Sequence, residues 1–506
     1  MARPLHSLCL CSARTSISCA SISRDRVVSG RTITRVLPLL TTPTRYRQRI
    51  MYSTSTTMAR RNIHSSTKRS SSTEQMLLTP IESAPQTALA PLSVLPLYMI
   101  IRSLLTTTIS SSPILLPPSL WIVSVLANTT NPILNPDKNP LLRFFLKHTF
   151  YAQFCAGENP VEVKQTIDKL KDIGFTGVIL GYAREVVLDD AQTKDLASCG
   201  EGEMAEECIR NEIIPWAEGT LETVRLAQRG DFVALKFTGA GRQALYSLAE
   251  RLPPSAALAD SIDSICSLAS ERGVRLLFDA EQTALQPGID IWTVEYMRKY
   301  NASPGNAVIY GTYQAYLKST SQTLRRHLMI ARGGGFTLGV KLVRGAYINS
   351  DPRHLIHDTK ADTDAAYDGI AECLLKRQWG EILRGDSQMP PVCLVLASHN
   401  AESVRKARAI CDAGEARIQM AFAQLQGMAD EVSCELVSKK PGHQDAKARG
   451  VDAYKYLIWG STGECMKYLL RRAHENRDAV ERTRDGRDAM WSELLRRFKG
   501  VIGVSV

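Results

Sequence analysis

The sequence predicts an α/β fold, a (βα)8 barrel of the TIM type with extra N-terminal helices and an inserted helical segment. Eight short apolar runs alternate with longer segments of helical periodicity. Such runs predict strands buried on both faces, as in a parallel sheet covered by helices, and eight repeats favour closure into a barrel. An open doubly wound sheet is the alternative, and the lack of a G-x-G-x-x-G turn after any predicted strand argues against it.

The predicted strands are rich in β-branched and aromatic residues. They span residues 176–180, 232–237, 274–278, 307–310, 339–343, 392–397, 417–422 and, more weakly, 451–456. Between them, small and aliphatic residues recur every three or four positions, which predicts helices, for example over 261–272 and 401–413. The glycines at 333–335 precede a strand and predict the end of a helix. The acidic connection 189–231 is long for a βα unit, and we expect it to contain helices of its own.

The net charge of the chain is concentrated at its N-terminus. Residues 1–73 contain thirteen Arg or Lys residues and one acidic residue, Asp25, so they account for the whole net charge of +11. A near-neutral remainder has no general attraction to nucleic acid. An Arg-rich, Ser-rich and acid-poor start predicts a mitochondrial transit segment; a basic tail that binds a partner is the alternative. The twelve cysteines form no CxxC pair or zinc-type cluster, which favours free thiols in a reducing compartment and predicts no metal site.

Residues 74–140 form an apolar, Pro-rich lead segment before a catalytic domain that we place at 141–500. Two apolar runs, 89–101 and 114–127, are each shorter than the roughly 20 residues that span a bilayer, and Pro117 and Pro118 interrupt the second. The pattern therefore favours peripheral membrane contact or a buried helix over a membrane span.

Polar residues follow the predicted strands at the end where βα barrels bind their substrates. They are Glu185, Lys236, Asp279 with Glu281, Gln314, Lys341 with Arg344 and Tyr347, His399 with Asn400, Gln424, and Tyr456. Any one of them has a structural explanation: the stem of Lys236 could pack on apolar surface, and Asp279 could cap a helix. Their number at one end of the barrel favours a site.

A second cluster follows the last predicted strand, in the segment YLLRRAHEN. Tyr468, Arg471, Arg472 and Glu475 have the spacing of one helix face. Two adjacent guanidiniums make a good clamp for a carboxylate, although a solvated helix face with an Arg–Glu pair fits the spacing as well. From the residues alone, the chain is a barrel enzyme for a small anionic substrate, and the cofactor stays open.

The motifs, in their order and spacing, resemble those of the proline dehydrogenase family over residues 141–476. The matching segments are FYAQFCAGE, FDAEQT, YGTYQAYL, VKLVRGAY, ASHN, FAQLQGMAD and YLLRRAHEN. The resemblance implies a monofunctional enzyme of the fungal mitochondrial type that holds FAD in a βα barrel. It would oxidise L-proline to Δ1-pyrroline-5-carboxylate, the first step of proline catabolism, and pass the electrons to membrane ubiquinone.

The resemblance also implies roles for individual residues. Asp279 and Lys341 would be catalytic, and Lys341 would lie near the flavin N5. The substrate would be bound by Lys236, Asp279, Tyr456, Tyr468, Arg471 and Arg472, with Glu185 and Glu475 holding the arginines. The flavin would contact Ala280, Gln314, Lys341, Arg344, Gly345, Ala346, Ser398 and His399.

Further expectations concern the surroundings of the enzyme. The chain ends at Val506 without room for a fused aldehyde dehydrogenase domain, so a separate pyrroline-5-carboxylate dehydrogenase is expected downstream. The implied location is the matrix side of the mitochondrial inner membrane. The segment KYLIWG at 455–460 and the acidic connection depart from the family pattern, which leaves the rim of the pocket open.

Two other activities remain open. One is hydroxyproline dehydrogenase, which the bulk of Tyr456 disfavours. The other is a Schiff-base aldolase or lyase, because Lys236 and Lys341 both follow or lie in strands of the predicted barrel. A non-catalytic scaffold is the remaining possibility.

Overall fold

The computed structural model describes residues 90–129, 131–183, 199, 202–348, 350–438, 451–478 and 480–503. These residues belong to one compact unit of the chain, Glu82–Val506. The predicted transit segment, 1–73, lies outside the described residues.

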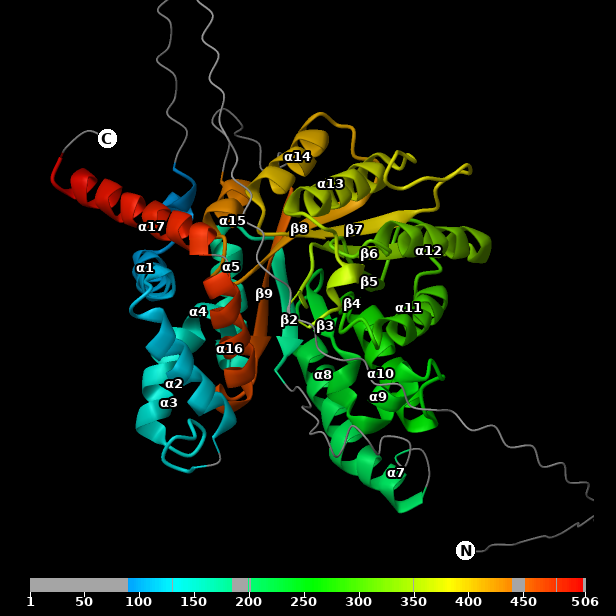
Figure 1. Cartoon of the computed structure of the whole chain (residues 1–506), viewed down its shortest axis with the longest axis horizontal. Coiled ribbons are helices and arrows are strands. Elements are labelled where there is room, and N and C mark those ends of the chain that lie inside the picture. Colours follow the sequence, from blue (N-terminus) through cyan, green and yellow to red (C-terminus); the bar gives the residue numbers. More distant parts are fainter. Residues whose placement is uncertain are drawn as a thin grey trace, which may run out of the picture. The chain divides into compact units, whose positions relative to one another are not determined.

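Eight parallel strands form a closed barrel, as predicted (Figure 1). They are β2 (Gly177–Tyr182), β3 (Phe232–Leu235), β4 (Arg275–Phe278), β5 (Ile309–Gln314), β6 (Leu338–Val343), β7 (Val392–Ala397), β8 (Gln419–Leu425) and β9 (Asp452–Trp459). Each strand pairs with the next in sequence, and β9 closes the ring by pairing with β2 from Gly177↔Tyr454 to Tyr182↔Trp459. A short strand that the sequence did not predict, β1 (Cys155–Gly157), pairs with the end of β9.

Helices cover the barrel between successive strands. They are α5 (Pro160–Ile173), α8 (Ile214–Leu226), α9 (Arg242–Ala249), α10 (Ala256–Arg272), α11 (Gln286–Tyr300), α12 (Thr320–Gly334), α13 (Lys360–Lys376), α14 (Ala401–Asp412), α15 (Asp430–Val437) and α16 (Thr462–Asp478). Short helical turns lie at η5 (Phe237–Ala240) and η6 (Arg353–Leu355). The glycine turn predicted at the end of a helix is confirmed: Gly335, with φ +68°, follows α12 in the left-handed conformation that glycine adopts readily.

The acidic connection is helical where it is described, as expected. It contains α7 (Gly202–Cys208) and the turn η4 (Ile209–Ile213), which leads directly into α8. Trp216 and Val224 of α8 are buried in the main core, so this part of the connection serves as the barrel helix between β2 and β3.

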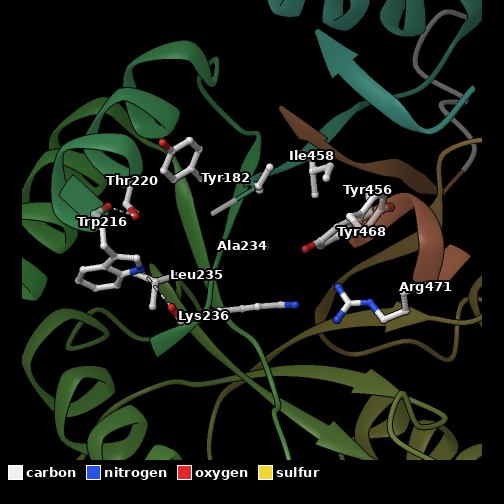
Figure 2. Close-up of a pocket in the computed structure, with 12 residues that line it drawn as sticks. Tyr182, Trp216, Thr220, Ala234, Leu235, Lys236, Tyr456, Ile458, Tyr468 and Arg471 are labelled. Carbon is white, nitrogen blue, oxygen red and sulfur yellow. Dashed lines mark hydrogen bonds between the residues drawn. The ribbon is translucent and has the colours of Figure 1, made fainter. Parts of the chain in front are cut away.

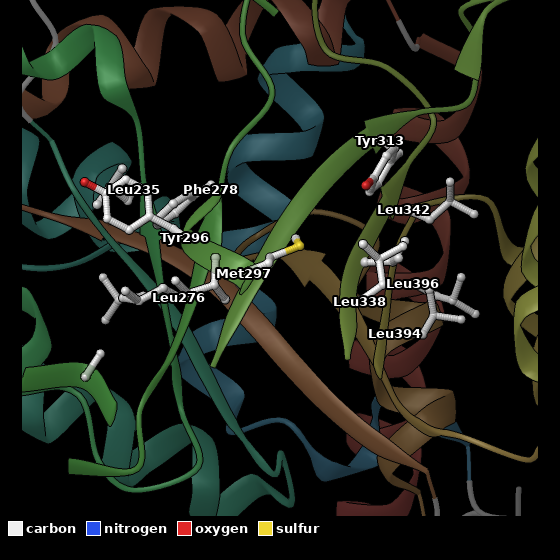
Figure 3. Close-up of a cluster of buried hydrophobic side chains, with 14 of the residues drawn as sticks. Leu235, Leu276, Phe278, Tyr296, Met297, Tyr313, Leu338, Leu342, Leu394 and Leu396 are labelled. Carbon is white, nitrogen blue, oxygen red and sulfur yellow. The ribbon is translucent and has the colours of Figure 1, made fainter. Parts of the chain in front are cut away.

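Side chains alternate between the two faces of each strand and form two apolar layers. Ile179, Phe232, Leu277, Val395 and Tyr454 share the cluster inside the barrel. Their neighbours along the strands form the larger cluster between strands and helices; Figure 3 shows Leu235, Leu276, Phe278, Leu338, Leu342, Leu394 and Leu396 of this layer. Because the period is two, any polar side chain in phase with the inner cluster must face the barrel interior.

Further helices precede and follow the barrel. They are η1 (Pro91–Val94), α1 (Leu97–Ser111), α2 (Leu116–Asn128), α3 (Pro140–Leu146), η2 (Lys147–Tyr151) and α4 (Ala152–Phe154) at the N-terminal side, and α17 (Val480–Val501) at the C-terminal side. α1 packs on α17, and α2 packs on α16 (Figure 1). Within the described ranges, no single helix is both long enough and apolar enough to cross a bilayer. α1 and α2 together would meet that test, but they are bent by 104° at their junction.

Candidate functional site

Five of the predicted site residues meet at the carboxyl end of the barrel. Side chains alternate between the two faces of a strand, and these five fall at positions that face the barrel interior. Lys236 and Asp279 directly follow β3 and β4, two positions after the inward-facing Ala234 and Leu277. Gln314 is the last residue of β5, whereas Lys341 and Tyr456 lie within β6 and β9 rather than after them. Strand geometry alone therefore directs these side chains into the mouth of the barrel.

Asp279 is the centre of this group. Its Oδ1 accepts a hydrogen bond from Lys341 Nζ at 2.5 Å, and its Oδ2 accepts one from the Tyr456 hydroxyl at 3.4 Å. The side chains of Lys341 and Asp279 are only 8% and 10% exposed, so little water screens the pair. Burial raises the pKa of Tyr456 well above its usual value, and the charge of Asp279 acts in the same direction. Tyr456 is therefore a neutral hydroxyl donor at physiological pH.

The predicted arginine cluster lies on α16, as expected. Arg472 Nη2 donates to Glu475 Oε1 at 2.6 Å, and the guanidinium carbon lies 4.7 Å from the centre of the Tyr468 ring. Arg471 approaches the same ring at 5.9 Å. The opposite side of α16 packs Met466 and Leu469 into an apolar cluster, which fixes the rotation of the helix. Stacking and ion pairing thus hold both guanidiniums in position before any ligand binds.

A pocket lies between these groups. It is lined by Gly181, Tyr182, Ala183, Trp216, Thr220, Ala234, Leu235, Lys236, Tyr456, Ile458, Tyr468 and Arg471. Figure 2 shows the Lys236 ammonium and the Arg471 guanidinium extending toward each other from opposite sides of this space, with Tyr456 and Tyr468 beside Arg471. Two cations opposed across a small pocket with aromatic walls can bind a compact anion with an apolar body.

The α8 side of this pocket was not predicted. Trp216 Nε1 donates to the backbone oxygen of Lys236 at 3.1 Å and so holds the start of the loop after β3. Trp216, Thr220 and Tyr182 line the wall opposite Tyr468 in Figure 2. A tryptophan on a helix usually indicates core packing, so no sequence signal distinguishes this residue from the core.

Glu281 is a second buried carboxylate near the mouth. It is 4% exposed, and it accepts hydrogen bonds from the backbone N–H (3.1 Å) and the hydroxyl of Thr238. Burial raises the pKa of Glu281, and the positive charge of Lys236 acts in the opposite direction. This carboxyl therefore takes up a proton more readily than an exposed glutamate does.

The other side of the mouth carries buried polar atoms that lack partners in the described part of the chain. They are Thr312 Oγ1, Gln314 Nε2, Gln424 Oε1, Gln426 Oε1 and Arg344 Nη1. They lie on, or directly after, β5, β6 and β8. Buried polar groups are almost always hydrogen-bonded in folded proteins, so this row indicates a polar ligand. A flavin, with polar atoms along its ring edge and its phosphates, fits such a row of donors and acceptors.

Most of the predicted flavin contacts surround that row. Gln314 Oε1 accepts from Ala346 N at 3.0 Å, and an added Cβ at Gly345 would lie 2.4 Å from the ring of Tyr316. Arg344 forms an ion pair with Asp364 on α13. Ser398 and Ala280 are buried, and His399 Nε2 accepts from Leu425 N at 3.1 Å. The neutral His399 ring therefore carries its proton on Nδ1.

The structure thus brings Lys236, Asp279, Lys341, Tyr456 and Arg471 together, with Tyr468, Arg472 and Glu475 next to them on α16. Arg344 directly follows β6, and Ser398 and His399 directly follow β7; these three residues do not line the pocket. Glu185, which was predicted to hold the arginines together with Glu475, lies outside the described residues.

Two comparisons with known proteins show the same family. The family model described as "Proline dehydrogenase" matches residues 163–485. The chain is 31% identical over 402 residues to a protein named "Probable proline dehydrogenase, mitochondrial" from Schizosaccharomyces pombe, covering 70% of this chain and 80% of that protein. It is 29% identical over 402 residues to human hydroxyproline dehydrogenase, covering 70% of this chain and 82% of that one.

A solved structure has the same fold. It is a crystal structure of proline utilization A (PutA) from Bdellovibrio bacteriovorus inactivated by N-propargylglycine, with a TM-score of 0.54 and 18% identity. The match covers 75% of this chain and only 38% of that longer chain. At this identity the likeness concerns the barrel architecture alone.

Proposed function

The chain belongs to the proline dehydrogenase family of oxidoreductases, and from that premise we propose that it oxidises L-proline to Δ1-pyrroline-5-carboxylate with bound FAD as hydride acceptor. One observation carries the proposal: cations from β3 and α16 face a single pocket beside the buried Asp279–Lys341 pair. Proline is a small zwitterion, so its site must replace the water lost from a carboxylate and from an amine.

The substrate carboxylate binds Arg471, Arg472 and Lys236. Arg472 is held by Glu475 and by the Tyr468 ring, so its fork of donors loses little freedom on binding. In this proposal Glu185, together with Glu475, holds the arginine pair.

The substrate ring is held over Asp279. The carboxylate of Asp279 accepts from the substrate amine, and Tyr456 and Tyr468 form the apolar walls that fix the ring carbon from which hydride leaves. Closing the pocket with two tyrosines and Trp216 also excludes water from the reacting atoms.

FAD is held on the other side of the mouth by Ala280, Gln314, Lys341, Arg344, Gly345, Ala346, Ser398 and His399. Bound flavin supplies the two-electron acceptor for the hydride. The buried atoms without partners on β5, β6 and β8 support this placement. The ammonium of Lys341 favours the negative charge that accompanies reduction.

The compartment and the electron acceptor complete the proposal. Relatives named mitochondrial, together with the Arg-rich segment 1–73, support import into mitochondria, with the catalytic domain at 141–500 on the matrix side of the inner membrane. Electrons pass to membrane ubiquinone through peripheral contact with the membrane, and a separate pyrroline-5-carboxylate dehydrogenase consumes the product.

An absorbance spectrum of the purified chain tests the proposal. The account expects flavin bands that bleach when L-proline is added without oxygen. A colourless chain, or flavin bands unchanged by proline, contradicts it. Trapping of a carbonyl substrate on Lys236 or Lys341 by borohydride would instead support a lyase.

Hydroxyproline dehydrogenase is the second candidate, because relatives of that name match at 28% and 29% identity. Tyr456 argues against it, since its ring lines the pocket, where its bulk would exclude a hydroxyl on the substrate ring. We expect Tyr456→Ser to raise the ratio of kcat/KM for trans-4-hydroxyproline over proline by about tenfold or more. Comparable turnover of the two substrates by the wild-type chain would favour the second candidate.

A further inference from the structure

The outer faces of α2 and α3 are apolar and exposed. Trp121 on α2 is 69% exposed, and Leu141 and Phe144 on α3 are 82% and 65% exposed. Ile122 and Phe145, which follow Trp121 and Phe144 in the sequence, are exposed as well. Leu141, Phe144 and Phe145 have the i, i+3, i+4 spacing of a single helix face. We call Trp121, Ile122, Leu141, Phe144 and Phe145 the α2–α3 face.

The fold of the described residues does not use this face. Leu126 of α2 and Leu146 of α3 are buried instead, in one cluster with Met466 and Leu469 of α16. Exposed apolar surface of this kind marks a site of contact with a partner or a membrane.

The charge around this face fits a lipid surface. Between Pro91 and Gly157 the sequence contains one acidic residue, Asp137, and four basic ones. Two of these, Arg143 and Lys147, are already paired with Glu158, so the main electrostatic feature is the near absence of carboxylates that anionic headgroups would repel. Tryptophan and phenylalanine are also the side chains that settle at the boundary of headgroups and acyl chains.

We propose that the α2–α3 face docks on an anionic phospholipid surface and inserts into one leaflet without crossing it. α2 has 13 residues, and α3 continues without a break through η2 and α4 to give 15 helical residues, so both are shorter than the roughly 20 residues that span a bilayer. The occupant is a membrane rather than a folded partner, because the face is formed by short helices with protruding aromatic and aliphatic tips and few polar groups to give specificity.

Docking here would place the membrane beside the active site. Met466 and Leu469 of α16 pack in one cluster with residues of α2 and α3, and Tyr468 and Arg471 of the same helix line the pocket. The membrane would therefore lie one helix away from the pocket. This step rests on the proposed function, under which the reduced enzyme must meet a quinone dissolved in the bilayer.

Vesicle flotation of the full chain tests the proposal. The probes are vesicles of phosphatidylcholine with and without phosphatidylglycerol. The wild type is expected to float with the anionic vesicles, and Trp121→Ser/Phe144→Ser/Phe145→Ser is expected to lower the partition coefficient by about tenfold or more. Leu252→Ser/Ile291→Ser/Met329→Ser, which removes exposed apolar residues from the connection after α9 and from α11 and α12, is the matched control and should float like the wild type.

Insertion is read out directly from tryptophan fluorescence. Brominated phosphatidylcholine should quench part of the emission of the wild type, and Trp121→Phe should abolish that part. Absence of flotation, equal flotation of the triple variant, or no quenching assigned to Trp121 would each overturn the proposal. Conversion of a wild-type dimer to a monomer by the triple variant, without a change in flotation, would assign the face to a second copy of the chain and also overturn it.

A soluble dye acceptor separates this inference from the proposed function. The triple variant should oxidise proline with the dye at the wild-type rate, which also shows that it is folded, and should lose proline oxidation with a quinone embedded in vesicles. A wild type that floats but does not oxidise proline with the dye would contradict the proposed function. It would not contradict the proposal that the α2–α3 face docks on a membrane.

Discussion

At the scale of single residues, the chemistry depends on the buried contact of Asp279 with Lys341. Each charge is almost fully removed from water, and each would be costly to bury without the other. The pair therefore fixes the positions of both side chains at the mouth of the barrel, where Tyr456 adds a third contact to Asp279.

Lys341→Met is the corresponding prediction. Without the ammonium, reduction of the flavin builds negative charge with no cation near it, so the midpoint potential should fall and kcat should drop by about 10- to 100-fold, with a smaller change in KM for proline. Stopped-flow flavin reduction measures this. Lys318→Met, which removes a lysine paired with Asp358 on the surface, is the control and should behave like the wild type. An unchanged rate of flavin reduction in Lys341→Met would contradict the role assigned to Lys341 in flavin reduction.

The mouth residues were predictable because strand ends and a period of two determine which side chains face inward. That is why Lys236, Asp279 and Lys341 could be selected from the sequence. Trp216 and Thr312 could not: the first depends on how α8 packs against β3, and the second is a polar residue inside a strand, which only its missing partner distinguishes.

At the scale of elements, Glu158 connects α3 and η2 to the start of α16. Its carboxylate contacts Arg143 and Lys147 at 3.0 Å and 2.6 Å and accepts from the backbone N–H of Thr462 at 3.0 Å, at the start of α16. Burial alone would raise the pKa of Glu158, but the hydrogen bonds from Arg143, Lys147 and Thr462 outweigh burial and lower the pKa to about 2. The folded state therefore favours the ionised form.

Glu158→Gln should change how stability depends on pH. Because the pKa in the folded chain is below the unfolded value of 4.5, the stabilisation is complete above pH 4.5 and is lost as the pH falls toward about 2. At neutral pH the variant should lose about 1–3 kcal/mol of unfolding free energy. Below about pH 4 its difference from the wild type should shrink. Urea unfolding over this range measures both effects, and a difference that does not vary with pH would contradict the assignment.

Elements were predicted well where the apolar pattern is continuous and less well at their ends. β5 extends to Gln314 because it stays paired with β6 as far as Val343, so the strand continues past the end of its apolar run. β1 has only three residues, and pairing with β9 rather than any local pattern makes it a strand.

At the scale of the whole molecule, a buried polar network attaches α1 to the barrel. Lys455 on the outer face of β9 is paired with Asp430 at 2.8 Å, and Asp430 also accepts from Ser103 of α1 at 3.2 Å. Gln153 of α4 donates to the same serine at 3.0 Å. Charge and hydrogen bonds thus hold α1 and α4 against the barrel. The sequence pattern does not reveal this network, because its link between α1 and the barrel joins Ser103 and Asp430, which are 327 residues apart.

Asp430→Asn should destabilise the chain by about 3–5 kcal/mol, because it leaves the Lys455 ammonium buried without a counter-charge. The double variant Asp430→Asn/Lys455→Met should recover most of that loss, since no buried charge remains. Chemical unfolding of both variants measures the effect. A double variant as unstable as the single one would contradict the prediction that the loss comes from the unpaired charge of Lys455.

The central claim is that paired guanidiniums hold the substrate carboxylate, and the selectivity for proline over pyrrolidine, which lacks that carboxylate, tests it most directly. The ratio of the two kcat/KM values should fall by about 10- to 100-fold in Arg471→Ala and in Arg472→Ala and stay unchanged in Arg477→Ala, an exposed arginine of the same helix. Because the ratio compares two substrates of one variant, a general loss of folding or flavin leaves it unaffected. A ratio that the two substitutions do not change would contradict the account.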